Sequence, residues 1–115
     1  VNMHIQHAPQ APTAEDFFAQ GLNSLGCQMY PQALASFRQA AGSGLSSGEL
    51  LYYTALAQLN GKRPRAQTFA NIQAVQKTLK SAVEKSPGLR RAWLLWAIVI
   101  EDYYVMNECR NLLLG

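Results

Sequence analysis

The chain has little charge, few cysteines and no long apolar run, and each shortage narrows what it can be. Charged residues make up 15% of its 115 residues, whereas hydrophobic residues make up 49%. The longest apolar run, from Ala92 to Ile100, is about half as long as a membrane-spanning helix requires. With so few charged side chains, some apolar side chains must lie on the protein surface, which favours a groove or an interface. We expect one small folded domain with an adhesive face and no membrane span.

The cysteine content is also low. Cys27 and Cys109 are too few for a disulfide framework or a zinc site, so we expect them to be buried small hydrophobes in a reducing compartment. No cationic segment followed by an apolar stretch opens the chain. We therefore expect no secretory signal and a cytoplasmic location.

Patterns that carry catalysis are missing as well. No glycine-rich phosphate loop is present, and neither cysteine has a nearby histidine or a CxxC context. His4 and His7 stand in the N-terminal segment, where they would hold a metal only weakly. Glu101 and Asp102 are adjacent, so their side chains point about a third of a turn apart, which suits solvation better than acid–base catalysis. We expect no enzyme activity, no cofactor and no metal.

What the sequence does contain is helical periodicity. Residues 1–13 show no period and are expected to be a flexible N-terminal arm. No later segment alternates with period two for long enough to form a strand. Apolar stripes predict five helices at about residues 14–25, 31–41, 46–59, 66–85 and 88–104, which makes the domain all-α. The fifth helix is apolar nearly all round and therefore needs cover on more than one side.

Local signals predict where these helices begin and end. The predicted starts are capping boxes or first-turn prolines: Thr13 with Asp16, Pro31, Ser46 with Glu49, and Ser86 with Pro87. The predicted ends contain glycine: Gly42-Ser43-Gly44 and Asn60-Gly61. The predicted core stripe of the fourth helix is Phe69, Ile72, Val75, Leu79, Ala82 and Val83.

A bulky apolar residue followed four positions later by a tiny one occurs three times, and each tiny residue is expected to let a neighbouring helix pack closely against it. The pairs are Phe17–Gly21, Leu51–Ala55 and Trp93–Ala97, and successive pairs start 34 and 42 residues apart. The interval of 42 also separates Phe37 from Leu79. The eight extra residues of the second interval therefore lie between Ala55 and Leu79. A recurring interval of this length is typical of repeat proteins, which build surfaces rather than catalytic centres.

These units resemble tetratricopeptide repeats, which are helix–turn–helix units of 34 residues. The first unit matches at Phe17, Gly21, Tyr30, Ala33, Phe37 and Ala40, but has Leu45 in place of the closing proline. The second matches at Leu51, Ala55, Leu79, Ala82 and Pro87, with Val75 where a small residue is preferred. The third supplies Trp93, Trp96, Ala97 and Ile100 from its first helix only.

The resemblance implies a right-handed α-solenoid of antiparallel helix pairs over residues 14–115. Repeat 1 would span 14–45, repeat 2 would span 46–87 with an insertion near 60–70, and a partial repeat 3 would span 88–115. The alternative is an irregular bundle of four or five helices with accidental periodicity.

In this family the first helices of successive pairs line a concave groove, and carrying its positions over gives ten residues. They are Phe18, Leu22, Leu25, Tyr52, Tyr53, Leu56, Leu59, Leu94, Leu95 and Ile98. None is a cation or an amide, so the resemblance does not extend to members that clamp a terminal carboxylate. It implies a scaffold or co-chaperone-like module that binds an amphipathic helix or an extended apolar segment of a partner. Alternatively these residues are core, or a second copy fills the groove in a homo-oligomer.

Charge is segregated along the chain. Residues 61–100 carry eight cations and one carboxylate, whereas the rest of the chain is net acidic. We expect a basic flank at Lys62, Arg63, Arg65, Arg90 and Arg91 that steers acidic partners. A solvated helix face is the plain alternative. A nucleic-acid-associated module is a third, but it would need exposed aromatic residues for stacking, and Phe69 is assigned to the core.

Overall fold

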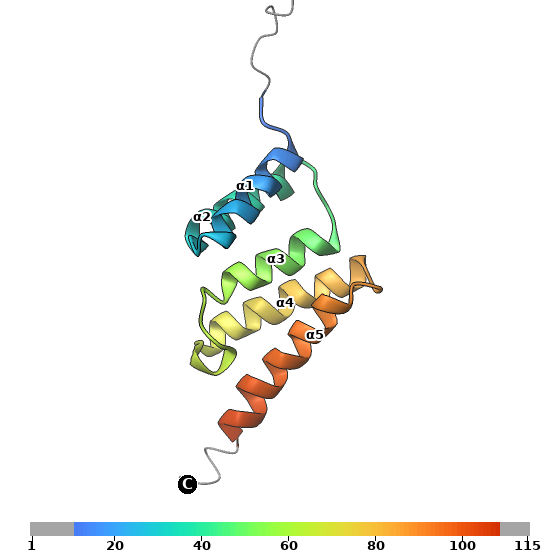
Figure 1. Cartoon of the computed structure of the whole chain (residues 1–115). Helices are drawn as coiled ribbons and strands as arrows, with labels where there is room; N and C mark the ends of the chain where they lie inside the picture. The colour runs from blue at the N-terminus through green and yellow to red at the C-terminus, as the bar shows by residue number, and fades with distance from the viewer. Residues whose placement is uncertain (1–10, 109–115) are drawn as a thin grey trace, which may run out of the picture.

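The computed structural model describes residues 11–108, and this part of the chain contains helices and turns but no strand. Five α-helices follow one another in the order α1 (Ala14–Gly26), α2 (Tyr30–Gly42), α3 (Gly48–Gln58), α4 (Phe69–Lys85) and α5 (Arg90–Val99). A short 3-10 helix, Pro64–Ala66, precedes α4, and a π-helical segment, Ile100–Val105, continues α5 (Figure 1). The all-α prediction with five helices is confirmed. The parts of the predicted arm and of the partial third repeat at 1–10 and 109–115, with Cys109, His4 and His7, lie outside the described residues.

The first two helices begin and end where local chemistry predicts. The Thr13 hydroxyl accepts a hydrogen bond from the Asp16 N–H, and the Asp16 carboxylate accepts one from the Thr13 N–H, which confirms the capping box. Pro31 lies in the first turn of α2, where its missing N–H has no intrahelical partner to lose. Beyond the end of α2, Gly44 has a φ of 106°, which glycine adopts without steric cost.

Helix α3 starts one residue later than its predicted capping box. Ser47 caps it by accepting a hydrogen bond of 3.1 Å from the Leu50 N–H. The Ser46 hydroxyl instead accepts a hydrogen bond of 2.8 Å from Nζ of Lys85. The prediction of a Ser46–Glu49 box is therefore wrong. Asn60 and Gly61 both have positive φ values and end the helix as predicted.

The extra residues between Ala55 and Leu79 lie mainly in the connection between α3 and α4, residues 59–68, here called the insertion loop. This connection runs over residues 59–68, whereas residues 27–29 suffice between α1 and α2. Thr68 caps α4 by accepting a hydrogen bond from the Asn71 N–H. The predicted start of this helix near Ala66 is wrong, because Ala66 belongs to the 3-10 helix.

The fifth helix also starts later than predicted. Its N-cap position is Leu89, which has no side-chain cap, and the Leu89 N–H donates to the carbonyl of Ser86 in a turn before the helix. The prediction of a helix start at Ser86-Pro87 is wrong for this reason. After Val99 the helix widens into the π-helical segment and returns to α geometry over residues 106–108.

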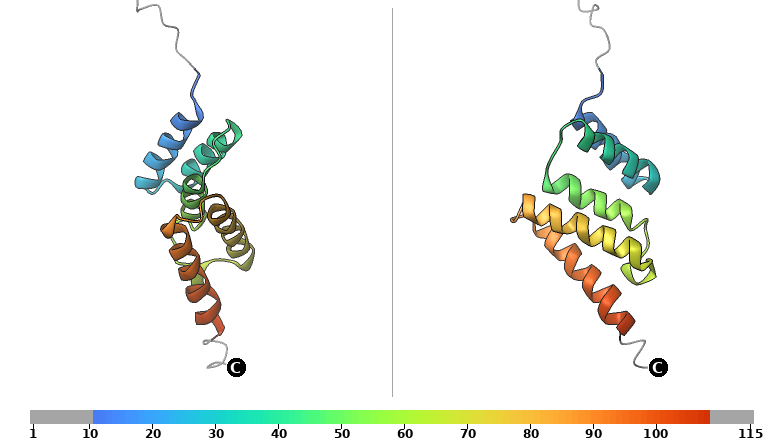
Figure 2. Two further views of the ribbon diagram at one scale, coloured as in Figure 1. Left: turned by 90° about the vertical axis from the view of Figure 1, so that its right-hand side faces the viewer. Right: turned by 180° about the vertical axis from the view of Figure 1, so that it is seen from behind.

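Each helix packs against the next one in the chain, and α1 and α5 both contact α3. Two helical hairpins, α1–α2 and α3–α4, are stacked, and α5 follows them at the end of the stack (Figure 1). In the side view of Figure 2, α1 and α5 lie on one side of the molecule and α2 and α4 on the other, with α3 between them. The side formed by α1, α3 and α5 is the one on which the predicted groove falls.

The core consists of two clusters. One joins α2 to α3 around Phe37 and Leu50, and the other joins α3, α4 and α5 around Ile72, Leu79 and Val99. Small residues permit the close approach, as predicted. A Cβ atom on Gly21 would lie 2.3 Å from the ring of Phe37, and Ala55 is fully buried.

Two predictions of burial are wrong. Cys27, at the end of α1, is exposed, because it follows the last turn of the helix and lies outside the stripe that faces α2. Phe69 is 54% exposed and does not belong to the core stripe of α4. It lies in the first turn of the helix, where it stacks on Tyr103 with ring centroids 6.5 Å apart. Within residues 11–108 none of the helices combines the length and hydropathy that crossing a membrane requires.

Candidate interaction surface

Aromatic side chains connect α1 to α2 and to α3. The ring of Phe18 on α1 lies 6.0 Å from the ring of Phe37 and 6.0 Å from that of Tyr53 on α3. Tyr53 in turn meets Tyr52 edge to face at 5.0 Å. Tilted and edge-to-face pairs of this kind stabilise packing beyond the area they bury. The row therefore fixes the position of α1 on α3.

Arg91 extends this row to α5. Its guanidinium lies 5.4 Å from the ring centre of Tyr52 and 5.6 Å from that of Tyr53, which is within cation–π range. It also donates hydrogen bonds of 3.0 Å to the Tyr53 hydroxyl and 3.1 Å to the Glu49 carboxylate. Burial raises the pKa of the Tyr52 phenol, and the nearby Arg91 charge opposes that rise. One arginine thus ties the first turn of α5 to the first half of α3.

A buried carboxylate holds the far end of the same side. Asp102, in the π-helical segment, accepts hydrogen bonds from Nη2 of Arg63 at 2.7 Å and from the Arg65 N–H at 2.9 Å. Nε of each arginine donates as well. These bonds, the side-chain bond from Arg63 foremost, hold the pKa of the Asp102 carboxyl well below its usual range, although burial acts in the opposite direction. The insertion loop is therefore clamped onto the π-helical segment that continues α5.

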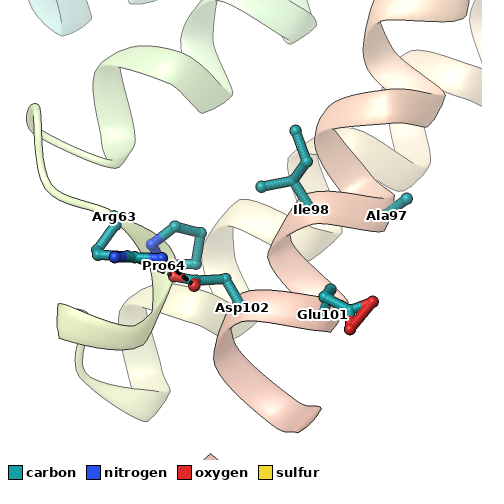
Figure 3. A pocket seen from close by; sticks show the side chains of 6 residues that line it. All are labelled: Arg63, Pro64, Ala97, Ile98, Glu101 and Asp102. Carbon is teal, nitrogen blue, oxygen red and sulfur yellow. Dashed lines mark hydrogen bonds and ion pairs between the residues drawn. The ribbon is translucent and has the colours of Figure 1, made fainter. Parts of the chain in front are cut away.

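A hollow of about 620 Å³ lies between this clamp and α5. Its lining residues are Arg63, Pro64, Ala97, Ile98, Glu101 and Asp102. In Figure 3, Asp102 points toward Arg63 and Pro64, whereas Ala97 and Glu101 lie on the other flank of the helix. The hollow has an apolar wall with charged groups at its rim. A concave site of this composition suits a mainly apolar side chain carrying a polar neighbour.

The structure places eight of the ten predicted groove residues on partly or fully open surface. Leu94 is 63% exposed, Ile98 is 45% exposed and Leu22 is 36% exposed. The other five are partly buried: Phe18, Leu25, Tyr52, Tyr53 and Leu56. Leu25 and Leu56 line a second hollow of about 280 Å³ together with Tyr30 and Lys62.

Leu59 and Leu95 differ from the other eight predicted residues. They are only 8% and 9% exposed and belong to the cluster between α3, α4 and α5. Leu59 is buried because α4 packs against the end of α3. Leu95 is buried because its side of α5 faces α4. Both are core residues, although Leu59 also forms part of the wall of the second hollow.

The predicted basic flank divides into paired and open cations. Arg63 and Arg65 share the Asp102 carboxylate, and Arg91 pairs with Glu49. Lys62 and Arg90 are exposed and make no ion pair among residues 11–108. Lys62 also lines a polar hollow of about 540 Å³ with Arg38 and the amides of Gln58 and Asn71. Three of the five predicted flank residues are thus paired with carboxylates of the same chain.

The adjoining flank of α5 is also open and apolar. Trp93 is 49% exposed and Ile100 is 43% exposed. With Trp96 and the exposed Ala97 they line a hollow of about 310 Å³. The prediction that Ala97 is a close-packing site like Gly21 and Ala55 is therefore wrong within the described residues, because no helix lies over it.

Groups that could bind a metal ion do not converge in the described part of the chain. No three residues of the types His, Cys, Asp and Glu approach one another closely enough to hold a metal ion within residues 11–108. Glu101 and Asp102 point in different directions, as expected, and Asp102 is occupied by two arginines (Figure 3).

Sequence reasoning missed the clamp at Asp102. Asp102 was interpreted as a solvated carboxylate beside Glu101, and the arginines of the insertion as part of an open basic flank. A carboxylate within an otherwise apolar helix was a signal that it has a buried partner, but nothing in the sequence identified the partner as a loop 37 residues earlier. Comparison with protein-family models, curated proteins and solved structures finds no match for this chain.

Proposed function

We propose that this chain is a tetratricopeptide-like helical repeat whose α1–α3–α5 side binds an apolar segment of a partner protein. One observation carries the proposal. Helix α5 leaves Leu94 63% exposed and Ile98 45% exposed beside a hollow of about 620 Å³. Exposed apolar surface of this kind, rimmed by charged groups, is typical of protein interaction sites. The internal repeat and the packing of each helix on the next support the repeat assignment.

The contacts on this side favour a surface that is formed before the partner arrives. Arg91 ties α5 to α3 at one end, and the Asp102 clamp ties α5 to the insertion loop at the other. Between them, Leu94 and Ile98 stand one helical turn apart, which matches the spacing of anchor residues on an amphipathic helix. A surface fixed in this way loses little conformational entropy on binding. Lys62 and Arg90 at its edges attract a partner with acidic flanks.

Leu94→Asp and Leu22→Asp test this surface. Each places a charge on an exposed position of the α1–α3–α5 side, so helicity is retained while binding of an apolar segment is lost. Fluorescence anisotropy of a labelled amphipathic helical peptide with leucine at i, i+3, i+4 and i+7 and acidic ends is the measurement. We expect saturable binding that each substitution weakens about tenfold or more, as expected for truncated interface anchors.

Met29→Asp is the matched control. Met29 is 45% exposed in the turn before α2, so the substitution adds the same charge elsewhere on the molecule. Its affinity for the peptide stays close to that of the unsubstituted chain. The proposal is wrong if the peptide does not bind, or if all three variants bind it equally well.

A further inference from the structure

One face of α5 is here called the tryptophan face and is formed by Trp93, Trp96, Ala97 and Ile100. The pattern of a bulky residue followed four positions later by a small one, which is Trp93 and Ala97 here, also occurs on α1 and α3. In the first unit, the ring of Phe37 on α2 covers Gly21 so closely that no Cβ fits. In the second, α4 covers Ala55 completely. In the third, Ala97 stays exposed. The small residue of this pattern is thus covered by a neighbouring helix in the first two units and exposed in the third.

The tryptophan face has no unsatisfied indole N–H group and is suited to apolar contact. The Trp93 indole N–H donates to the carbonyl of Pro87 at 2.8 Å, and the Trp96 indole N–H donates to the Gln76 amide oxygen at 3.3 Å. The two rings are stacked 6.1 Å apart. Both indole donors are therefore satisfied inside the molecule, and what faces outward is apolar. A polar ligand would gain no hydrogen bond here, whereas an apolar helix face would fit.

The charges at the ends of α5 indicate which helix fits. Arg90 lies in the first turn of α5, where a cation opposes the helix dipole, and Glu101 lies just after Val99 in the π-helical segment. Neither makes an ion pair or a side-chain hydrogen bond within residues 11–108, and both are exposed. An antiparallel helix with the same sequence would set its glutamate beside Arg90 and its arginine beside Glu101.

The spacing of these residues makes the face complementary to itself. The midpoint between Arg90 and Glu101 falls next to Trp96, and so does the midpoint between Trp93 and Ile100. An antiparallel pair centred there places each Trp93 near the Ile100 of the other chain, with the small Ala97 close to the crossing point. Both the apolar and the charged pairs are then satisfied by one two-fold axis.

We propose that the tryptophan face is the dimer contact of this chain, in which α5 pairs antiparallel with α5 of a second copy. The face adjoins the flank of Leu94 and Ile98 and shares Ala97 with the hollow of about 620 Å³, so the dimer covers one wall of that hollow and leaves Leu94 and Ile98 open. A contact one helix long is at the small end of protein interfaces, below about 1,200 Å² in total. The dimer is therefore weak and reversible.

Charge reversal tests the antiparallel pairing. Arg90→Glu and Glu101→Arg each create two repulsive contacts in a homodimer, so each weakens self-association by about tenfold or more. An equimolar mixture of the two variants regains dimerisation, because every charge then meets its opposite. The double variant Arg90→Glu/Glu101→Arg also regains it. Sedimentation equilibrium from about 1 µM to about 1 mM covers the affinities expected for so small a contact.

Two further variants separate this dimer from the partner surface. Ala97→Glu removes self-association and leaves the circular dichroism spectrum unchanged, since Ala97 is exposed. Lys80→Glu, an exposed charge reversal on α4, leaves self-association as it was. Leu94→Asp lowers peptide binding without changing the dimer, so one proposal can fail while the other stands.

Three results would overturn the dimer. They are a monomer at every concentration, a dimer that Ala97→Glu does not weaken, and a mixture of the two charge variants that stays monomeric. A fourth result would also overturn the dimer proposal. It is a chain that stays monomeric and binds an amphipathic helix of another protein through Trp93.

Discussion

Gly21 lies under the ring of Phe37, and this contact sets how closely α1 and α2 approach. A Cβ at position 21 would lie 2.3 Å from one ring carbon and 2.5 Å from another. Phe37 is 1% exposed, so its ring has little room to move aside. Gly26, in the last turn of the same helix, has nothing within 4 Å of where its Cβ would be. The two glycines of α1 therefore differ in function although both are helical.

Gly21→Ala lowers the free energy of unfolding by about 1–2 kcal/mol, because the cost of overpacking exceeds the gain in helix propensity. Gly26→Ala is the control, and it is neutral or stabilising by up to about 1 kcal/mol. Urea titration followed by far-UV circular dichroism measures both. Equal effects of the two substitutions would show that Gly21 is not a contact site.

At the scale of single elements, the π-helical segment attaches the C-terminal end of the described residues to the rest of the molecule. Three successive residues of the segment make contacts with the rest of the molecule: Asp102 with the insertion loop, Tyr103 with Phe69, and Tyr104 with Gln76. Its wider turn supports this arrangement, because successive side chains spread over a smaller angle than in an α-helix. The segment therefore links the insertion loop, through Asp102, and the start of α4, through Tyr103, to the end of α5.

Asp102→Asn lowers the free energy of unfolding at pH 7 by about 1–2 kcal/mol, since charged hydrogen bonds to two arginines are lost. The folded state holds the Asp102 charge to a lower pH than the unfolded state does. The carboxylate's contribution is therefore present above the unfolded pKa of about 4 and is lost as the pH falls below it.

Thermal unfolding of the unsubstituted chain and of Asp102→Asn, followed from pH 7 to pH 3, measures this effect. The two melting temperatures converge as the solution becomes more acidic. A difference that stays constant over this range would contradict a role for the ionised carboxylate.

At the scale of the whole molecule, stability is divided between two clusters. One is centred on Phe37 in the first hairpin and the other on Ile72, Val75 and Leu79 in the second. Because each helix contacts mainly its neighbours in the chain, loss of one cluster need not open the other. The first hairpin and the α3–α5 unit are expected to open separately.

Phe37→Ala removes about 3–5 kcal/mol of packing from the first cluster. In hydrogen exchange, the amides of α1 and α2 then lose protection while those of α4 keep most of theirs. Val75→Ala is the matched change in the second cluster, and its effect concentrates in α4 and α5. A uniform loss of protection in both variants would show that the molecule opens as one unit.

The sequence predicted elements better than contacts. The capping box at Thr13, the first-turn proline at Pro31 and the end at Asn60-Gly61 were all correct, because each depends on residues within one turn of chain. The starts of α3, α4 and α5 were placed too early by one to three residues. There, neighbouring polar residues or prolines offered more than one start, and packing selected among them.

The candidate surface was predicted less completely. Helical periodicity found the apolar side of α1, α3 and α5, but Leu59 and Leu95 on that side are core. Periodicity indicates that a residue is apolar and which direction it faces. It does not indicate whether another helix packs on that residue: Leu59 and Leu95 belong to the cluster shared with α4, whereas Leu94 and Ile98 stay exposed.

The sequence by itself determined that the chain is helical, where most helices stop, and which positions are small enough for close packing. These properties follow from local propensity and spacing. Only the tertiary structure decided that Asp102 binds Arg63 and Arg65, that Arg91 joins α5 to Tyr53, and that Trp93 and Ala97 remain open. Those outcomes depend on which segments lie side by side. A one-dimensional pattern holds no record of that, since contacts between residues far apart in sequence form only when the helices pack.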